Sequence, residues 1–172
     1  MKILSKQRNS RMCMICGLDN EYGVNAPFYN MEDGCVMTVF RYKEQHQSYP
    51  GRVHGGMITA MLDEMGLRSL WAKELSEETF GVTISLDTKY RKPVPYETEL
   101  IGRGVVVKNT SHFIITDSYI MDKDGEILAN GRIKYIKMDT QKIQEGVEVH
   151  EEMPYLVEDG RTEIEGPFFD NL

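Results

Sequence analysis

An apolar pattern with helical spacing covers residues 53–74. The apolar residues occur nearly all round the helix that this stretch would form, not on one stripe: Met57, Ile58, Ala60, Met61, Leu62, Met65, Leu67, Leu70 and Trp71. At 1.5 Å per residue, about 20 residues give a helix of ~30 Å. A helix that is apolar on every side is buried. The pattern therefore predicts one long helix at the centre of the protein.

Strand-like patterns lie on both sides of this helix. Residues 35–42 predict a strand before it. After it, Val82, Ile84 and Leu86 alternate with polar residues, which predicts a strand with one buried face. Further strands are expected over residues 99–108, 112–121 and 126–138. This order indicates an α+β domain in which a four-stranded antiparallel meander follows a strand and a buried helix.

The two ends of the chain lack such patterns. Glycine, asparagine and proline interrupt residues 1–34, which we expect to be irregular. Residues 139–172 contain isolated apolar residues among acids, and they either dock as an extension or stay mobile. We therefore interpret residues 1–172 as a single domain, with a core over residues 35–138 and an acidic C-terminal extension over residues 139–172.

Composition and charge limit the classes of function. The 172 residues are 41% hydrophobic and 27% charged, which suits one globular domain. The net charge is −7, but residues 139–172 alone hold ten acids against two basic residues, so the remaining body is close to neutral. It has no basic stripe for nucleic acid. No apolar run approaches the ~18 residues of a membrane span. We expect a cytoplasmic protein that binds neither nucleic acid nor membrane.

Three cysteines in a chain without an export signal indicate reduced thiols. Cys13 and Cys16 have the spacing of half a zinc site, but a structural zinc site takes four ligands and the sequence has no second such pair. Cys35 lies in a strand-like run, and His46 is the only nearby imidazole apart from His54. We therefore favour a tight buried turn at Cys13–Cys16 and expect no bound metal.

The start of the long helix holds the candidate chemistry. Gly55 and Gly56 follow His54, and they leave backbone N–H groups at the positive end of the helix dipole, where an oxyanion can be bound. Asp63 has no basic residue three or four positions away, so its burial would be costly without a functional role. Glu64, in contrast, has Arg68 four residues later, a common solvated pair. The alternatives are an ordinary glycine-containing helix start and an Asp63 that is exposed or satisfied by a backbone donor.

Three segments together resemble a known family. Val53-His54-Gly55-Gly56, with Asp63 nine positions after the histidine, resembles the signature of PaaI-like hotdog-fold acyl-CoA thioesterases, in the hydroxybenzoyl-CoA thioesterase superfamily. Residues 81–93 resemble the family's strand after the helix, with its Tyr-x-x-Pro ending. Cys16-Gly17-x-x-Asn20-x-x-Gly23 is similar to its N-terminal Cys-Gly turn. The resemblance covers roughly residues 13–138.

The resemblance implies a hotdog fold, in which an antiparallel sheet wraps around one long central helix, and a catalytic role for several residues. Asp63 would be the general base or the nucleophile, and the Gly55 N–H would polarise the thioester carbonyl. Thr83 would supply a hydroxyl that helps to hold the water, and His54 would orient the carbonyl or the glycine turn. Several members place an asparagine where this chain has Ser48, so a serine hydroxyl would have to replace it.

The resemblance also implies an acyl-CoA substrate, whose coenzyme A would be the only cofactor-like group. Lys89, Arg91 and Lys92 would meet its phosphates, and Gly56 and Met57 would contact the substrate. Each of these cations alone is equally well read as a solvated strand end, and methionines at helical spacing are more often plain core.

The spacing of Gly55 and Asp63 supports a homodimer with shared sites. Eight residues separate them, or ~12 Å along one helix, whereas a base and an oxyanion donor must both lie within ~3 Å of one reacting centre. Two helices related by a twofold axis can supply both. The homodimer could pair again into a homotetramer. The rival interpretations are a hotdog module that binds acyl-CoA without turnover, and a hotdog dehydratase or hydratase.

Overall fold

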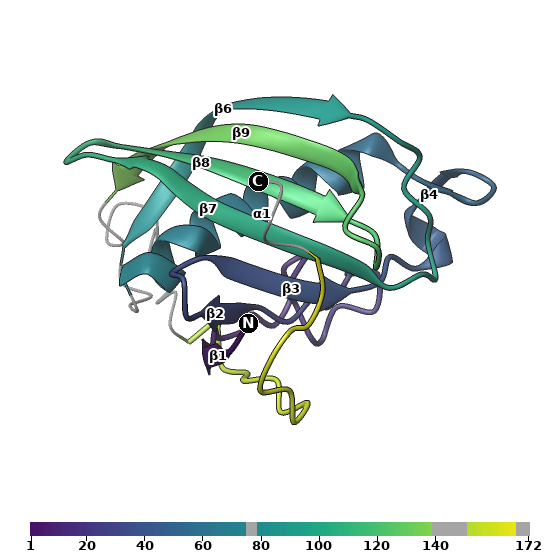
Figure 1. Ribbon diagram of the computed structural model, residues 1–172, viewed down its shortest axis with the longest axis horizontal. Helices are drawn as coiled ribbons and strands as arrows, with labels where there is room; N and C mark the ends of the chain where they lie inside the picture. The colour runs from purple at the N-terminus through teal and green to yellow at the C-terminus, as the bar shows by residue number, and fades with distance from the viewer. Residues whose placement is uncertain (75–78, 139–150, 168–172) are drawn as a thin grey trace.

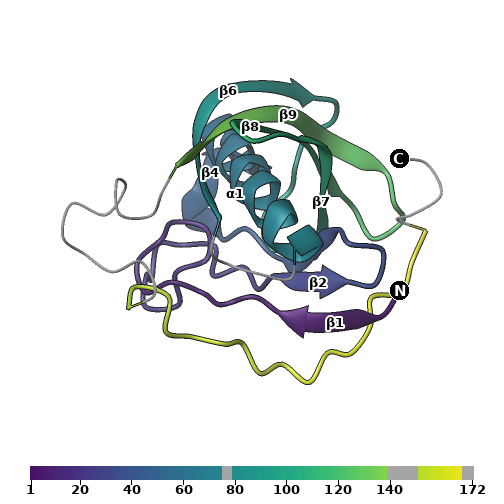
Figure 2. The same ribbon diagram turned by 90° about the vertical axis from the view of Figure 1, so that its left-hand side faces the viewer.

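One long helix lies in the curve of an antiparallel sheet (Figure 1, Figure 2). The computed structural model describes residues 1–74, 79–138 and 151–167. The helix is α1 (Gly55–Glu74), preceded by a single 3-10 turn, η1 (Glu44–His46). The strands are β1 (Ile3–Lys6), β2 (Tyr29–Met31), β3 (Val36–Phe40), β4 (Gln47–Tyr49), β5 (Arg52–Val53), β6 (Phe80–Tyr90), β7 (Leu100–Asn109), β8 (Phe113–Met121) and β9 (Ile127–Met138). The predicted hotdog fold is confirmed.

The sheet corrects the predicted meander. Its strand order is β1-β2-β3-β7-β8-β9-β6, so β6 pairs with β9, while β3 lies beside β7. The connection over residues 91–99 contains Pro93 and Pro95 and has an extended reach of ~30 Å. It can therefore cross the ends of β9 and β8 to start β7. Because β6 ends this strand order, it is an edge strand, and its other side pairs with no strand in the described chain.

The burial of β6 differs from the simple alternation. Val82 and Ile84, predicted to be buried, are 41% and 49% exposed. The register of β6 against β9 shifts between Thr83 and Ser85, which marks a bulge. A bulge inserts one residue and reverses which side chains face the core. Thr83 before it and Leu86 after it both face inward: Thr83 contacts α1, and Leu86 packs against a buried cluster.

The central position of α1 is confirmed. Ten of its residues are buried: Ile58, Met61, Leu62, Met65, Gly66, Arg68, Ser69, Leu70, Trp71 and Ala72. At Gly66 the helix lies against β8 and β9: an added Cβ atom would lie 2.1 Å from the Tyr135 hydroxyl and 2.6 Å from the Thr116 Oγ1 atom. A larger residue there would require these side chains to move.

Both ends of the chain contribute more structure than expected. The segment 1–34 is not irregular throughout, because β1 and β2 extend the sheet beyond β3. Residues 151–167 run along this edge, with bridges that join Lys2 to Glu163 and Asn9 to Tyr155. Met153 and Ile164 are buried there. This part of the acidic extension is therefore docked, while residues 139–150 and 168–172 lie outside the described residues.

None of the helices in the described parts of the chain is long and apolar enough to cross a membrane.

Candidate active site

Asp63 and Thr83, predicted to act together, are in contact. The Thr83 hydroxyl on β6 donates to both carboxylate oxygens of Asp63 on α1, at 2.9 and 3.1 Å. The bulge that follows Thr83 aims its side chain at the helix. The contact therefore depends on the bulge in β6 and on the side of α1 from which Asp63 projects toward β6.

Asp63 is half-buried and has no cationic partner in the described parts of the chain. None of the ion pairs among the described residues includes it. Burial raises the pKa of Asp63, and the charge of Glu64 adds to this, while the hydrogen bond from Thr83 and the nearby Tyr135 hydroxyl oppose it. The result is a carboxylate that is a stronger base than an exposed aspartate.

The start of α1 is organised by His54. Its Nδ1 atom accepts a hydrogen bond from the Gly56 N–H at 2.9 Å, and its carbonyl oxygen accepts from Met57 N and Ile58 N. His54 thus caps the helix. The Gly55 N–H is the first amide of α1 and has no partner within the helix, and none is found for it elsewhere in the described chain. It is the amide that remains available to a ligand.

Tyr90 fixes the same helix start from β6. Its hydroxyl donates to the Gly55 carbonyl oxygen at 3.1 Å and lies 2.7 Å from the Thr59 Oγ1 atom. Sequence analysis did not single out Tyr90 as a site residue, although it is the tyrosine of the Tyr-x-x-Pro ending. It also missed Tyr135, whose hydroxyl donates to the Asp63 carbonyl oxygen at 2.7 Å. Only the alternation of β9 hinted that Tyr135 faces the helix.

A cleft of about 600 Å³ opens at this helix start. It is lined by Arg52, Val53, Gly55, Gly56, Ile58, Tyr90, Arg91, Lys92, Pro93 and Val94. The structure thus places Arg91 and Lys92, two of the predicted phosphate-binding residues, in one cleft with the glycines, together with Arg52. Arg91 donates to the Asn130 side chain and Lys92 pairs with Glu126. Two arginines and the paired Lys92 around the half-buried Gly55 amide form a site suited to an anionic ligand.

Lys89, Met57 and Ser48 lie outside this cleft. Lys89 is exposed on β6 and is not among the cleft residues. Met57 is partly buried and lines a separate hollow of about 260 Å³ beside His54. Ser48 is exposed on β4, and no hydrogen bond within the described residues connects it with Asp63. Ser48 nevertheless lies near the start of α1. Its neighbour Gln47 pairs with Val53, which is two residues before Gly55.

Glu64 differs from its neighbour Asp63 because it has a cationic partner. It pairs with Arg68 as the spacing predicts, at 2.7 Å, but the pair is not solvated, because the Arg68 side chain is only 1% exposed. The nearby side chains of Cys13 and Cys16 complete the one group of potential metal ligands found among the described residues. Sequence spacing missed it, since Glu64 is 51 positions from Cys13.

Residues 50–129, which include Gly55, Asp63 and Thr83, match the family model of the thioesterase superfamily. This chain is similar to that superfamily over these residues, which make up slightly less than half of its length. It is 25% identical over 140 residues to acyl-coenzyme A thioesterase THEM4 of Rattus norvegicus, covering 81% of this chain and 57% of that protein. It is 23% identical over 100 residues to acyl-coenzyme A thioesterase 13 of Homo sapiens, covering 58% and 70%. The chain thus spans about half the length of the THEM4 relatives.

Solved structures share the fold. A crystal structure of a thioesterase superfamily protein superposes with a TM-score of 0.65 at 25% identity, covering 73% of this chain and 63% of that one. A hypothetical thioesterase from Streptococcus pneumoniae TIGR4, solved with coenzyme A, gives a TM-score of 0.57 at 20% identity, covering 67% and 87%. The chain therefore shares the hotdog fold with these structures over 73% and 67% of its length, respectively.

Proposed function

We propose that the protein is an acyl-CoA thioesterase that hydrolyses its substrate to a carboxylic acid and free coenzyme A. The observation that supports this most strongly is Asp63, a carboxylate held by the Thr83 hydroxyl without any cationic partner in the described chain. The relatives named as acyl-coenzyme A thioesterases and the coenzyme A-bound hotdog structure favour the same substrate class.

In this mechanism Asp63 acts as the general base. It takes a proton from water while the water oxygen bonds to the thioester carbonyl carbon. The negative charge that develops on the carbonyl oxygen is bound by the Gly55 N–H at the positive end of α1. The C–S bond then breaks, the electron pair leaves with sulfur, and Asp63 returns the proton to the coenzyme A thiolate. His54 positions the glycines through its bond to the Gly56 N–H. A Ser48 hydroxyl near the helix start is suited to hold the water.

Direct attack by Asp63 as a nucleophile is the competing route. It would form an anhydride that water then opens. A single turnover in ¹⁸O-labelled water tests for this route: opening of the anhydride at the Asp63 carbonyl labels the Asp63 carboxylate, whereas general-base catalysis leaves it unlabelled.

The cleft at the helix start is suited to the coenzyme A part of the substrate. Arg52, Arg91 and Lys92 line it, and guanidinium and ammonium groups bind phosphates. Lys89, exposed on β6 outside the cleft, would meet a phosphate only where the substrate extends beyond it, and Gly56 and Met57 flank the amide at which the acyl group would arrive.

The proposed assembly is a homodimer formed through β6. This edge strand has one unpaired side, and an apolar row crosses the adjoining outer face: Val82, Ile136 and Phe113, which are cross-strand neighbours and 38–41% exposed. Unpaired edges and exposed apolar surfaces favour association. A twofold axis there would let Asp63 of one subunit and Gly55 of the other serve one substrate, and two such dimers could form a homotetramer.

Release of free thiol from a panel of acyl-CoA substrates tests the proposal. Aliphatic and aromatic acyl groups should be included, with the acid product identified by mass spectrometry. Turnover of at least one substrate to acid and coenzyme A is expected. Saturable acyl-CoA binding without thiol release would contradict hydrolysis and favour a binding module. Conversion of an enoyl-CoA to a hydroxyacyl-CoA would favour a hydratase.

A further inference from the structure

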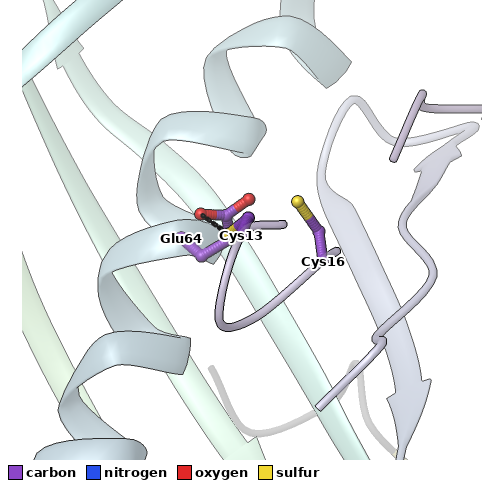
Figure 3. Close-up of side chains that lie close together, drawn as sticks. All are labelled: Cys13, Cys16 and Glu64. Carbon is purple, nitrogen blue, oxygen red and sulfur yellow. Dashed lines mark hydrogen bonds between the residues drawn. The ribbon is translucent and has the colours of Figure 1, made fainter. Parts of the chain in front are cut away.

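Two thiols of the N-terminal loop and one carboxylate of α1 meet on the side of the helix that the proposed chemistry leaves unused (Figure 3). The Cys13 Sγ atom lies 3.9 Å from the Glu64 Oε2 atom. The Sγ atoms of Cys13 and Cys16 and one Glu64 oxygen all lie within 4.8 Å of one another. Residues far apart in the sequence thus bring three potential metal-ligating atoms to one point.

We propose that Cys13, Cys16 and Glu64 bind one Zn²⁺ ion, with water as the fourth ligand. Zinc takes four ligands in a tetrahedron, with Zn–S bonds of about 2.3 Å and Zn–O bonds of ~2.0–2.2 Å, so its ligand atoms lie roughly 3.4–3.8 Å apart. The Cys13 Sγ–Glu64 Oε2 separation of 3.9 Å is close to this range, and the other separations, which are at most 4.8 Å, need to contract by ~1 Å or less. Thiolates and a carboxylate with one open position form a donor set that zinc accepts.

The loop around the cysteines is built tightly enough to present both sulfur atoms. Gly17 N donates to the Cys13 carbonyl oxygen at 2.9 Å and closes the turn, and an added Cβ atom on Gly17 would lie 2.4 Å from that oxygen. Ile15 N donates to the Cys13 Sγ atom at 3.3 Å, and the Ser10 hydroxyl lies 3.3 Å from the Cys16 Sγ atom. Such outer contacts orient the ligands of a metal site.

Arg68 orients the third ligand. Its Nε atom donates to the Oε1 atom of Glu64 at 2.7 Å, which leaves the Oε2 atom turned toward Cys13. The guanidinium is fixed in turn by the Gln7 side chain and the Arg8 carbonyl oxygen, at 3.1 Å each. The two cations would therefore use different oxygens of one carboxylate.

The charges of the cluster also balance. Without metal, the charges of Glu64 and Arg68 cancel, so the cluster is neutral when both thiols are protonated. When Zn²⁺ binds, two thiol protons leave, so the three anionic ligands are matched by Zn²⁺ and Arg68. Binding would thus add no net charge to this partly buried site. We expected no metal at this turn because the sequence has no second pair of cysteines. In the fold, Glu64 of α1 supplies a third potential ligand instead.

Titration of the reduced, metal-free protein with Co²⁺ under anaerobic conditions tests the site. Wild type should bind one Co²⁺ per chain, with a near-ultraviolet thiolate-to-cobalt band and the visible bands of a four-coordinate ion, and Zn²⁺ should abolish both. Zinc should also raise the Tm.

Variants identify the ligands. Cys13→Ser and Cys16→Ser should each reduce the thiolate band and the affinity, and Glu64→Gln should keep a thiolate band but bind about tenfold or more weakly. Cys35→Ser is the matched control, because Cys35 is a buried thiol elsewhere, beside Arg103, and its variant should titrate like wild type. Circular dichroism establishes that each variant is folded. Since Cys13 is only half-buried, Cys13→Ser is the variant on which the test rests if Cys16→Ser does not fold.

The proposal is overturned if reduced wild type gives no thiolate-to-cobalt band. It is equally overturned if folded Cys13→Ser binds Co²⁺ with the wild-type affinity and spectrum.

Discussion

The Thr83 hydroxyl on β6 spans both carboxylate oxygens of Asp63 on α1, at 2.9 and 3.1 Å. This contact joins the edge strand to the central helix. Of the two acids in the middle of α1, Glu64 pairs with Arg68, whereas Asp63 has no cationic partner among the described residues. The Thr83 contact also stabilises the ionised form of Asp63, against the effect of burial. The pKa of Asp63 therefore depends in part on Thr83, which can be substituted without changing Asp63.

Thr83→Val should move the pH dependence of turnover. Asp63 must be ionised to act as a base, so kcat/KM should fall at low pH along the titration of Asp63. Because the Thr83 hydrogen bond lowers the pKa of Asp63, its loss should raise that pKa and shift the acid limb to higher pH. Thr83→Ser keeps the hydroxyl and should retain the wild-type limb. An unchanged limb in Thr83→Val would mean that another group sets it.

Asp63→Asn should gain stability relative to wild type as the pH rises. The pKa of Asp63 is higher in the folded than in the unfolded protein, where it is about 3.9. Its stabilising contribution is thus fully present below that value and is lost as the pH rises through the folded pKa. Asparagine does not titrate. Urea unfolding of both proteins at acidic and neutral pH measures this, and a difference in free energy of unfolding that stays constant with pH would contradict it.

Gly66→Ala should destabilise the protein by about 1–3 kcal/mol through overpacking. Its new Cβ atom would lie 2.1 Å from the Tyr135 hydroxyl and 2.6 Å from the Thr116 Oγ1 atom. Tyr135→Phe alone should lose about 1 kcal/mol with its hydrogen bond to the Asp63 carbonyl oxygen. Because the second change removes the clashing oxygen, the double variant should lose less than the sum of the two. Denaturant unfolding of all four proteins measures this coupling, and additive losses would argue against the close approach.

The sequence predicted the regular elements because their patterns are local. The apolar residues of α1, and the strand-like segments separated by turn residues in β7, β8 and β9, placed these elements within two residues of their bounds. The partner of β6 depends on contacts between distant segments, and its bulge between Thr83 and Ser85 leaves no local pattern. Hence Val82 and Ile84 were assigned to the wrong face.

For the candidate site too, residues in local motifs could be predicted from the sequence, whereas contacts between distant segments could not. Asp63, Gly55 and Thr83 lie in motifs that a single sequence reveals. Tyr135 and the contact between Cys13 and Glu64 join segments whose approach only the fold determines. Arg68 likewise has the spacing of a surface pair but faces Gln7 and Phe28 inside the protein.

Two inactive variants should complement each other if each site uses two subunits. Gly55→Pro removes the oxyanion donor, and Asp63→Asn removes the base. In a mixed dimer one site has both defects and the other has none, so random mixing should restore about a quarter of wild-type activity. The variants are refolded together and heterodimers are verified by native mass spectrometry. Verified heterodimers without activity would place both groups in one subunit.

Turnover by Asp63→Asn tests the central role of Asp63 most directly. The substitution replaces one carboxylate oxygen with an amide nitrogen and should reduce kcat on the order of 10²-fold or more, with the fold retained by circular dichroism. Asp124→Asn makes the same change in an exposed turn and should keep wild-type kcat. The account predicts loss of thiol release in Asp63→Asn alone; near-wild-type turnover in that variant would contradict it.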